Sequence, residues 1–549
     1  MACDEVDRQA PAAVRKPKLH GRAFYESIGS PKYIVAPMVN QSEFAWRMLS
    51  RSFMPESEKS SLLAYSPMFH SKLFSEQPKY RAKEFQPTKP GSDVPFLDGN
   101  PGLDRPLFVQ FCANDPQLLL SAARHVAPYC DAVDLNLGCP QGIARTGHYG
   151  AFLQEDQDLI YRLINTLHED LDIPVTAKIR ILDTKEETLK YAQNVLRAGA
   201  SILTVHGRRR EQKGHLTGLA DWQMIRYLRD NLPPETVLFA NGNILQHGDV
   251  EKCLAATGAD GVMSAEGNLS NPGIFAPPPP PDQQVRGYWH GKDGKGGWRV
   301  DEVFRRYLDI LHQHVLGATP PARRPLFVPG DDTAWMSEEI VVPGMRPRAD
   351  GKPGKPKKRK NELARENPML HSANFSAMQP HLFHLLRHMV VRHHDVRDAL
   401  AGARTGDMET YEAICRLVEK KVAEGILEYE RTGGKSVEEE DAPATAAERG
   451  KEEGQEDDPE SSARTIRECK RPWWVVQPVI RPLPKEAMAK GAVQMRKKDK
   501  KRMAEEMEAD RGENQDVKRS KDEEADDKPA ATEQLEKTTS YPSSELVSG

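Results

Sequence analysis

The chain contains little cysteine. Its 549 residues include only seven cysteines, and no two of them form a C-x-x-C pair. This scarcity argues against a disulfide framework and against a zinc ribbon, since both need closely spaced cysteines. The cysteines stand at positions 3, 112, 130, 139, 253, 415 and 469.

Long hydrophobic runs are also absent. No apolar stretch approaches the length of a membrane span, and the N-terminal residues are polar, unlike a secretion signal. These absences predict a soluble monomer of a reducing compartment, cytoplasmic, nuclear or both, with no membrane partner. Hydrophobic residues make up 38% and charged residues 29%, so we expect part of the chain to lie outside any folded core.

Short apolar runs alternate with longer amphipathic ones in the N-terminal half, which is typical of parallel strands covered by helices. Eight such units predict an α/β fold, a (β/α)8 TIM barrel, over residues 23–275. A doubly wound Rossmann fold is the alternative, but no G-x-G-x-x-G follows the first run. The expected strands are 33–38, 63–69, 106–111, 132–137, 174–181, 202–206, 237–240 and 261–265.

Composition divides the rest of the chain. We expect a disordered N-terminus (1–22), a Pro/Gly-rich insertion (276–300) and a small all-helical domain (301–431) with an irregular insertion (317–370). Helical periodicity is clearest at 302–316, 378–400 and 408–426. The remainder, 432–549, is a low-complexity charged tail, except for the aromatic segment 471–484, which we expect to dock, most simply onto the protein's own surface.

One turn presents a cysteine at the end of a predicted strand. The apolar run 132–137 stops abruptly at Gly138-Cys139-Pro140, and proline excludes a mid-helix or mid-sheet position. The residues alone leave two interpretations open, a reactive thiol or a small buried apolar side chain.

Polar residues follow the predicted strands at the rim where TIM barrels build their active sites. Taken singly, Lys178 is also compatible with a solvated strand end, His206 with a hydrogen-bonded core histidine, and Asn241-Gly242 with a simple turn. Together the residues predict a site. The set is Pro37, Met38, Gln110, Asn136, Cys139, Lys178, Arg180, His206, Asn241, Gly242, Asn243, Ala265, Glu266 and Gly267.

This set suits a flavin. A cation such as Lys178 stabilises the negative charge of a reduced isoalloxazine, and the Gln110 amide offers both a donor and an acceptor to the ring edge. Phosphate in barrels commonly sits at the loops after strands seven and eight, here 241–243 and 265–267. The sequence therefore predicts FMN and not FAD, and no metal.

The run N-x-G-C-P followed by G-H-Y-G-A resembles the tRNA-dihydrouridine synthases, flavoenzymes that reduce uridines in transfer RNA. The form Gly147-His148-Tyr149-Gly150 is most similar to the eukaryotic branch that modifies positions 16 and 17 of the D-loop. The resemblance implies tRNA as partner and NADPH, or NADH, as reductant. It also implies FMN contacts from Met38, Gln110, Lys178, His206, the 241–243 turn and the 265–266 turn.

In the same resemblance Cys139 is the general acid and Asn136 lies against the target base. We expect hydride from flavin N5 to add to C6 of uracil while Cys139 protonates C5. Arg180 stands two residues from Lys178 and therefore on the same strand face, so a further hypothesis is that it binds the pyrimidine carbonyls. Glu266 departs from the Gly-Arg pair of many bacterial members, so we expect only backbone contacts to phosphate there.

The helical region is cationic, which favours a grip on RNA phosphates. His384 and His388 have the i, i+4 spacing of metal ligands, but no third ligand is suitably spaced. Two basic runs, 357–360 and 496–502, resemble nuclear import signals or adhesive tails. The cationic residues are Arg387, Arg392, Arg397, Arg404, His384, His388, His393 and His394.

Two other functions remain open on the sequence. An FMN barrel acting on free pyrimidines would share the hydride chemistry without needing a cationic helical domain. A catalytically inactive tRNA-binding chaperone would need neither Cys139 nor Lys178.

Overall fold

The computed structural model describes residues 18–343, 372–438 and 462–489, apart from 284 and 292–294. The two basic runs and most of the predicted N- and C-terminal tails lie outside the described residues. Residues 18–22 do not behave as a tail, since helix α1 (Gly21–Ser27) begins there and Arg22 pairs with Asp260.

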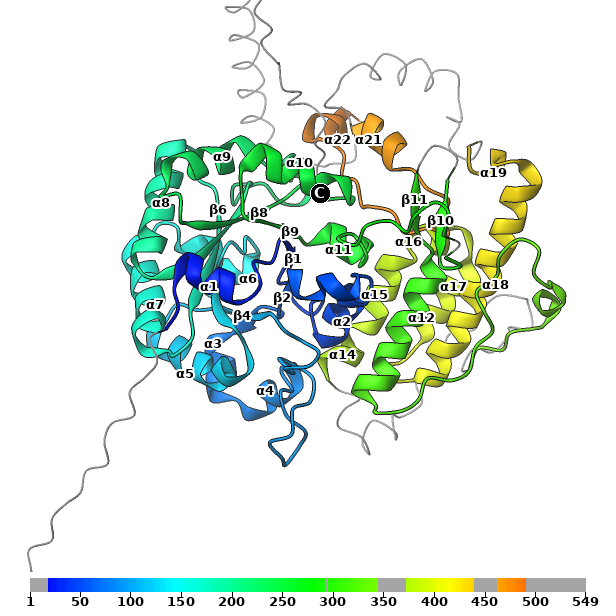
Figure 1. The fold of residues 1–549 in the computed structure, drawn as a ribbon, viewed down its shortest axis with the longest axis horizontal. Helices are drawn as coiled ribbons and strands as arrows, with labels where there is room; N and C mark the ends of the chain where they lie inside the picture. Colours follow the sequence, from blue (N-terminus) through cyan, green and yellow to red (C-terminus); the bar gives the residue numbers. More distant parts are fainter. Residues whose placement is uncertain (1–17, 284, 292–294, 344–371, 439–461, 490–549) are drawn as a thin grey trace, which may run out of the picture.

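A closed parallel barrel forms the N-terminal half, which confirms the predicted TIM barrel and excludes the doubly wound alternative (Figure 1). The strands pair in the order β2-β1-β9-β8-β7-β6-β5-β4, and a β2–β4 pairing closes the ring. The short strand β3 (Phe69–His70) extends the sheet beside β4. The barrel strands are β1 (Tyr33–Val35), β2 (Leu62–Tyr65), β4 (Leu107–Cys112), β5 (Ala132–Leu137), β6 (Val175–Arg180), β7 (Ala200–His206), β8 (Val237–Asn241) and β9 (Gly261–Ser264).

Helices follow the strands and cover the outside of the barrel. Helix α5 (Pro116–Val126) begins at an Asp-Pro pair, where the Asp115 side chain accepts from the backbone N–H groups of Gln117 and Leu118. The segment between β2 and β4 contains two short helices, α3 (Ser71–Glu76) and α4 (Pro78–Glu84). The other barrel helices are α2 (Phe44–Ser52), α5 (Pro116–Val126), α6 (Gly142–Thr146), α7 (Gln157–Asp170), α8 (Lys185–Arg197), α9 (Trp222–Asn231), α10 (Gly248–Thr257) and α11 (Glu266–Ser270).

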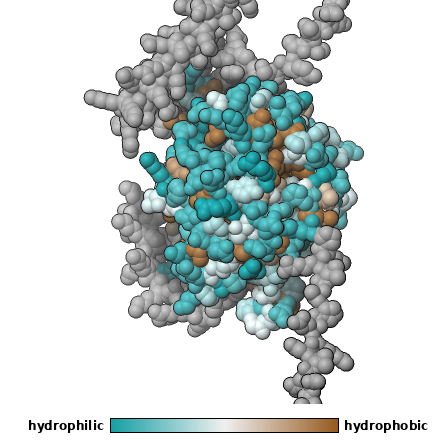
Figure 2. Space-filling view, turned by 90° about the vertical axis from the view of Figure 1, so that its left-hand side faces the viewer, coloured by the Kyte–Doolittle hydropathy of each residue, from teal (hydrophilic) through white to brown (hydrophobic). Residues whose placement is uncertain are grey.

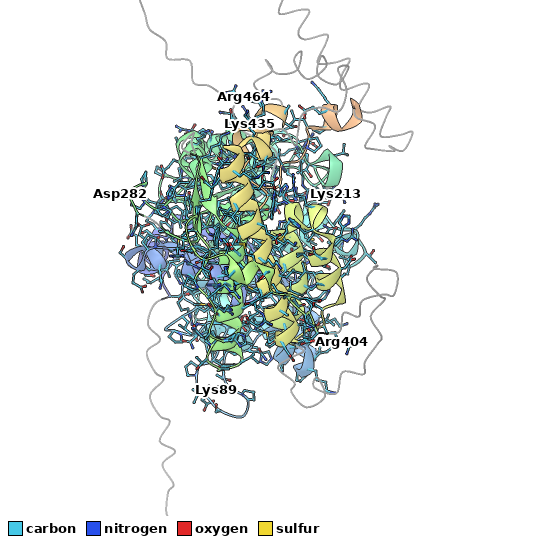
Figure 3. All side chains as sticks on the ribbon, turned by 90° about the vertical axis from the view of Figure 1, so that its right-hand side faces the viewer. Lys89, Lys213, Asp282, Arg404, Lys435 and Arg464 are labelled. Carbon is cyan, nitrogen blue, oxygen red and sulfur yellow. The ribbon has the colours of Figure 1, made fainter. Side chains whose placement is uncertain are left out.

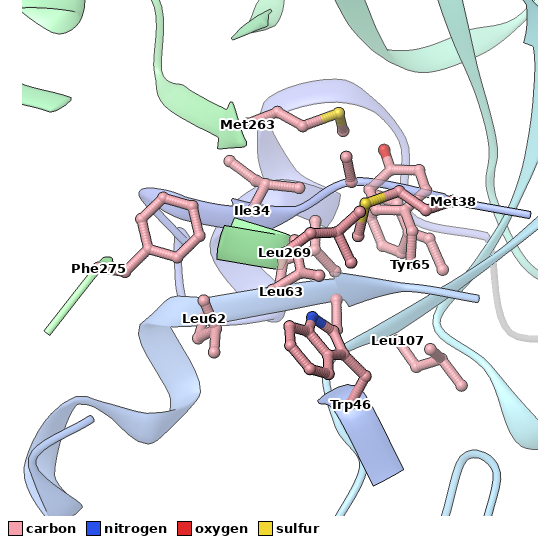
Figure 4. Packing of buried hydrophobic residues seen from close by; sticks show 14 of the residues in the cluster. Ile34, Met38, Trp46, Leu62, Leu63, Tyr65, Leu107, Met263, Leu269 and Phe275 are labelled. Atoms are coloured by element: carbon pink, nitrogen blue, oxygen red, sulfur yellow. The ribbon is translucent and has the colours of Figure 1, made fainter. Parts of the chain in front are cut away.

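The core fills the barrel interior and the layer between strands and helices. Figure 4 shows β1 and β2 packing Ile34 and Leu63 beside Met263 of β9 and Trp46 of α2. The face of the barrel turned away from the helical domain is mostly hydrophilic, with only scattered hydrophobic residues (Figure 2).

The segment 276–300, expected to be an irregular insertion, contains an antiparallel hairpin. Strands β10 (Tyr288–His290) and β11 (Gly296–Trp298) pair, and Trp298 lies buried against Phe53 of the barrel. The burial of this aromatic side chain explains why a Pro/Gly-rich stretch becomes ordered here.

A helical domain follows and packs on α2 (Figure 1). The His381 ring stacks on Trp46 at 4.0 Å, and the Ala45 N–H donates to Asn374 Oδ1 at 2.9 Å. Its elements are α12 (Val300–Ile310) with a π-helical turn (Leu311–Val315), α14 (Ala373–Ser376), α15 (Met378–Leu385), α16 (Arg387–Arg392), α17 (His394–Gly402), α18 (Met408–Thr432) and α19 (Lys435–Glu438).

The helical periodicity predicted over 378–400 is present but does not form one continuous helix, because the chain breaks twice into α15, α16 and α17. The breaks fall at Leu386 and at His393, whose ψ of 86° is not helical. Each short helix thereby turns its own apolar face inward, as the buried side chains of Leu382, Met389 and Val396 show.

The aromatic segment near the C-terminus docks on the protein itself, as expected. Trp474 is 1% exposed, and its carbonyl accepts from the Val300 N–H at 2.9 Å. Two short helices flank it, α21 (Ser462–Cys469) and α22 (Pro484–Ala489). Among the described helices, none has the length and apolar character needed to cross a membrane.

Candidate active site

A cavity opens at the carboxyl ends of β6 to β9, where the sequence predicts the site. The cavity has a volume of about 220 Å³ and is open to solvent. Eight predicted residues line it: Arg180, His206, Asn241, Gly242, Asn243, Ala265, Glu266 and Gly267.

A hydrogen-bonded network lies under the mouth at β4 and β5. Gln110 is fully buried; its Nε2 donates to Asp134 Oδ2 and its Oε1 accepts from Asn136 Nδ2, both at 2.8 Å. Burial raises the pKa of Asp134 to about 6. Gln110 therefore has a fixed orientation before any ligand binds.

Cys139 is half-buried in a turn that other side chains shape. Asn136 Oδ1 accepts from the Cys139 N–H at 2.9 Å, and Arg180 Nε donates to the Gly138 carbonyl at 2.7 Å. Gly150 has φ +66°, and a Cβ there would stand 2.9 Å from Cys139 Cβ. The turn thus fixes Cys139 next to Pro140 in the chain. Pro140 lines the cavity, whereas the predicted residues Cys139, Gln110, Asn136 and Lys178 are not among its lining residues.

Asn136, predicted to read the substrate edge, has much of its amide engaged within the chain. Its oxygen accepts from the N–H groups of Gly138 and Cys139, and its nitrogen donates to Gln110. These contacts show that Asn136 shapes the Cys139 turn. A direct contact between Asn136 and the substrate stays a prediction.

Lys178 lies at the barrel centre and donates from Nζ to Asn241 Oδ1 at 2.9 Å. Burial lowers the pKa of its ammonium to about 7, with a smaller contribution from the positive charge of Arg180. Its charge therefore responds to pH near neutrality and to any anion brought beside it.

Arg180 and Arg208 form the cationic wall of the cavity, beside His206. Arg208 Nη1 donates to His206 Nε2 at 3.1 Å, which requires a neutral imidazole. Burial, then the charges of Arg180, Lys178 and Arg208, lower the pKa of His206 well below its ordinary value. Burial also lowers the pKa of Arg180 to about 10 and that of Arg208 to about 9.

Sequence reasoning missed Arg208. It follows the β7 end by two residues, so the rule that selected His206 would also have found it. Its guanidinium donates to the Gly218 carbonyl and to Asn243 Oδ1 at 2.7 Å. This second contact ties the β7 loop to the 241–243 turn.

The turn after β8 is tightly constrained. Gly242 has φ +117°, and a Cβ there would stand 2.6 Å from Ala220 Cβ. Asn243 has φ +62°, and its side chain accepts from the Ala220 N–H. The backbone of this turn therefore approaches its neighbour more closely than any side chain permits.

Replacing Gly242 by alanine is expected to lower the free energy of unfolding by about 1–3 kcal/mol, because it adds both strain and a clash. Urea denaturation measures the change. Gly248→Ala is the matched control, since a Cβ there meets nothing within 4 Å. Equal stability of the two variants would contradict the close approach.

The remaining predicted cofactor residues lie at the β1 and β9 ends. Pro37 and Met38 follow β1, where the Ala36 N–H donates to the Ser264 carbonyl, but neither lines the cavity. Ala265 and Glu266 do line it, and Glu266 Oε1 pairs with Arg481 Nη2 at 2.8 Å.

Several side chains of the predicted cationic face of the helical domain are engaged in contacts within the chain. Arg387 donates to the backbone carbonyls of His384 and Gln477, and Arg397 pairs with Asp398. The His393 ring lies 4.7 Å from that of Trp473. Within the described residues, no cluster of three or more acidic, histidine or cysteine side chains could hold a metal.

Comparison with known proteins gives a consistent picture. A family model described as dihydrouridine synthase (Dus) matches residues 34–287. The chain is 41% identical over 467 residues to the tRNA-dihydrouridine(16/17) synthase (NAD(P)(+)) of Schizosaccharomyces pombe, which covers 85% of this chain and 92% of that protein.

Two further relatives match over shorter spans. The Saccharomyces cerevisiae protein of the same name is 55% identical over 54% of this chain and 64% of its own length. The protein of Mus musculus named tRNA-dihydrouridine(16/17) synthase (NAD(P)(+))-like is 45% identical over 54% of this chain and 55% of its own. On the extent and identity of the first match, this chain belongs to the dihydrouridine synthase family.

Proposed function

We propose that this chain reduces uridines of tRNA to 5,6-dihydrouridine, at D-loop positions 16 and 17, with FMN as its flavin and NADPH or NADH as reductant. The observation that carries the proposal is the Cys139 turn, which the Asn136 and Arg180 contacts hold next to Pro140, a lining residue of the cationic cavity. The positions follow the names of the relatives.

The donor set fits a flavin mononucleotide. Arg180 and Arg208 line the cavity with cationic groups, and Lys178 lies beneath Asn241, where it can answer negative charge on an isoalloxazine ring. Gly242, which has no side chain, lines the cavity in the turn after β8. When bound, FMN supplies the hydride that adds to C6 of uracil.

The chain's own residues complete the reaction. Cys139 donates the proton that C5 requires, from the face opposite the hydride. The buried Gln110–Asn136 pair keeps the turn, and therefore the thiol, in place. Arg180 offers guanidinium N–H groups toward the pyrimidine carbonyls. His206 is neutral and therefore adds no further positive charge beside Arg180.

A uridine of folded tRNA must leave its stack to reach this mouth, which costs a few kcal/mol. The helical domain, packed directly on α2, supplies the backbone contacts that offset this cost. Arg392 and His394 are exposed on its surface and are the first candidates for phosphate contacts.

The function is tested by incubating the FMN-loaded protein and NADPH with unmodified tRNA, free uracil and orotate, then mapping dihydrouridine in the tRNA by sequencing. We expect product in tRNA alone, at positions 16 and 17. Turnover of a free pyrimidine would favour the barrel reductase alternative. A colourless protein that binds tRNA and cannot be loaded with FMN would favour the chaperone alternative.

FMN binding is expected to take up a proton at alkaline pH. In the empty site Lys178 loses its proton near pH 7, whereas a bound anion keeps it charged. The contribution of Lys178 to FMN affinity should therefore not change with pH below about pH 7. Above pH 7 the FMN affinity should fall by up to about tenfold per pH unit.

Fluorescence titrations across this range measure the effect. Lys178→Met should abolish the dependence, and Lys190→Met, an exposed residue of α8, should retain it. The same slope in both variants would assign the proton to another group.

A further inference from the structure

The C-terminal strap, which we define as residues 471–489, joins the helical domain to the mouth of the barrel (Figure 1, orange). Its first half is fixed on the hairpin and the helical domain. The Val476 N–H donates to the Trp298 carbonyl at 2.9 Å, and Arg387 donates to the Gln477 carbonyl. Trp473 and Trp474 pack against Gly425 of α18.

The second half of the strap lies on the barrel. Pro484 stands beside Gly218, and α22 contacts the short turn at Gly214–Leu216. Helix α21 holds α22 in place, because the Ser462 N–H donates to Glu486 at 2.9 Å. The residues between these anchors therefore cross the edge of the cavity.

Arg481 lies in this crossing and lines the cavity, whereas every other described lining residue comes from the barrel. Its Nη2 pairs with Glu266 Oε1 at 2.8 Å, and its Nη1 donates to the Gly214 carbonyl at 3.3 Å. The guanidinium thus joins the loop after β7 to the turn after β9, the two sides of the cavity mouth.

The charge of Glu266 is the reason this contact matters. The turns after β8 and β9 form the end of the cavity where a barrel receives phosphate. Glu266 is an acidic lining residue there, while Arg180 and Arg208 supply positive charge. An unneutralised carboxylate would repel a phosphate dianion at this short range.

We propose that Arg481 completes the cofactor site: by pairing with Glu266 it cancels the carboxylate that would repel the phosphate group of FMN, so the strap makes the cavity selective for phosphorylated flavin. This inference rests on the proposed function, because it takes the ligand to be FMN. The strap is then part of the binding site and not only a tether between domains.

The test compares FMN with riboflavin, which lacks the phosphate, on the full chain stripped of cofactor and without tRNA. Arg481→Ala should weaken FMN binding about tenfold, the effect of losing one charge-assisted interaction, and leave riboflavin binding unchanged. Arg481 is 38% exposed, so its removal disturbs little packing. Flavin fluorescence quenching gives both dissociation constants.

Two further variants separate charge from structure. Glu266→Gln/Arg481→Ala should recover most of the FMN affinity, because no carboxylate remains to be neutralised. Arg464→Ala is the matched control. Arg464 on α21 pairs with Glu468 and is not a lining residue of the cavity (Figure 3). The variant loses the same charge and should bind FMN as the unaltered chain does.

Several outcomes would overturn the inference. They are unchanged FMN binding by Arg481→Ala, an equal loss of FMN and riboflavin binding by that variant, and weak FMN binding that persists in Glu266→Gln/Arg481→Ala. An unchanged FMN-to-riboflavin ratio with weakened tRNA binding would assign Arg481 to RNA phosphates instead. Failure of the unaltered chain to bind either flavin would instead overturn the proposed function itself.

Discussion

Replacing Cys139 by alanine is expected to lower the single-turnover rate of dihydrouridine formation by about 10²–10⁴-fold, the usual contribution of a positioned general acid. Hydride addition to C6 leaves charge that only a proton at C5 can remove, and the Asn136 and Gly150 contacts hold this thiol in place. FMN binding should be unaffected, since the thiol does not shape the cationic wall. Rapid-quench assays with prereduced enzyme measure the rate.

Cys112→Ala is the matched control for this experiment. Cys112 belongs to the small cluster against which Cys139 packs, yet it is 1% exposed, and burial raises its pKa to about 12. It therefore cannot deliver a proton to the cavity, and its replacement should leave the rate close to that of the unaltered chain. A near-normal rate in Cys139→Ala, with FMN bound, would remove the thiol from the mechanism.

Replacing Arg47 by methionine is expected to lower the free energy of unfolding by about 3–5 kcal/mol, because two buried carboxylates lose their common partner. Arg47 is fully buried on α2; its Nε donates to Asp104 at 3.0 Å and its Nη2 donates to Asp98 at 2.8 Å. Chemical denaturation followed by circular dichroism measures the change.

The controls for Arg47 test whether charge or volume is responsible. Arg226→Met removes an exposed partner of Asp230 on α9 and should cost less than about 1 kcal/mol. Arg47→Met/Asp98→Asn/Asp104→Asn should recover part of the loss, since neutral amides tolerate burial better than unpaired carboxylates. A triple variant as unstable as the single one would show that packing dominates.

The barrel and its rim follow from local patterns in the sequence. A parallel strand that is buried on both faces appears in the sequence as a continuous apolar run, and eight such runs predicted the closed barrel. The side chain at the end of each run reaches the rim, so His206 and Asn241 were found without knowing the pairing. Arg208 was within reach of the same rule.

Helix continuity in the C-terminal domain did not follow from its periodicity. The apolar spacing over 378–400 fits one helix, but α15, α16 and α17 each turn to meet a different neighbour. Local periodicity indicates which residues are buried. It does not indicate whether the segments that they pack against are arranged so that one straight helix can contact all of them.

The sequence alone determined the fold class, the position of Cys139 and most of the rim, because each depends on burial patterns within a few residues. Only the tertiary structure decided that Asn136 is engaged in shaping the Cys139 turn and that Arg481 meets Glu266 across 215 residues of chain. Contacts of that kind depend on the path of the whole chain, and burial periodicity carries no record of which distant segments meet.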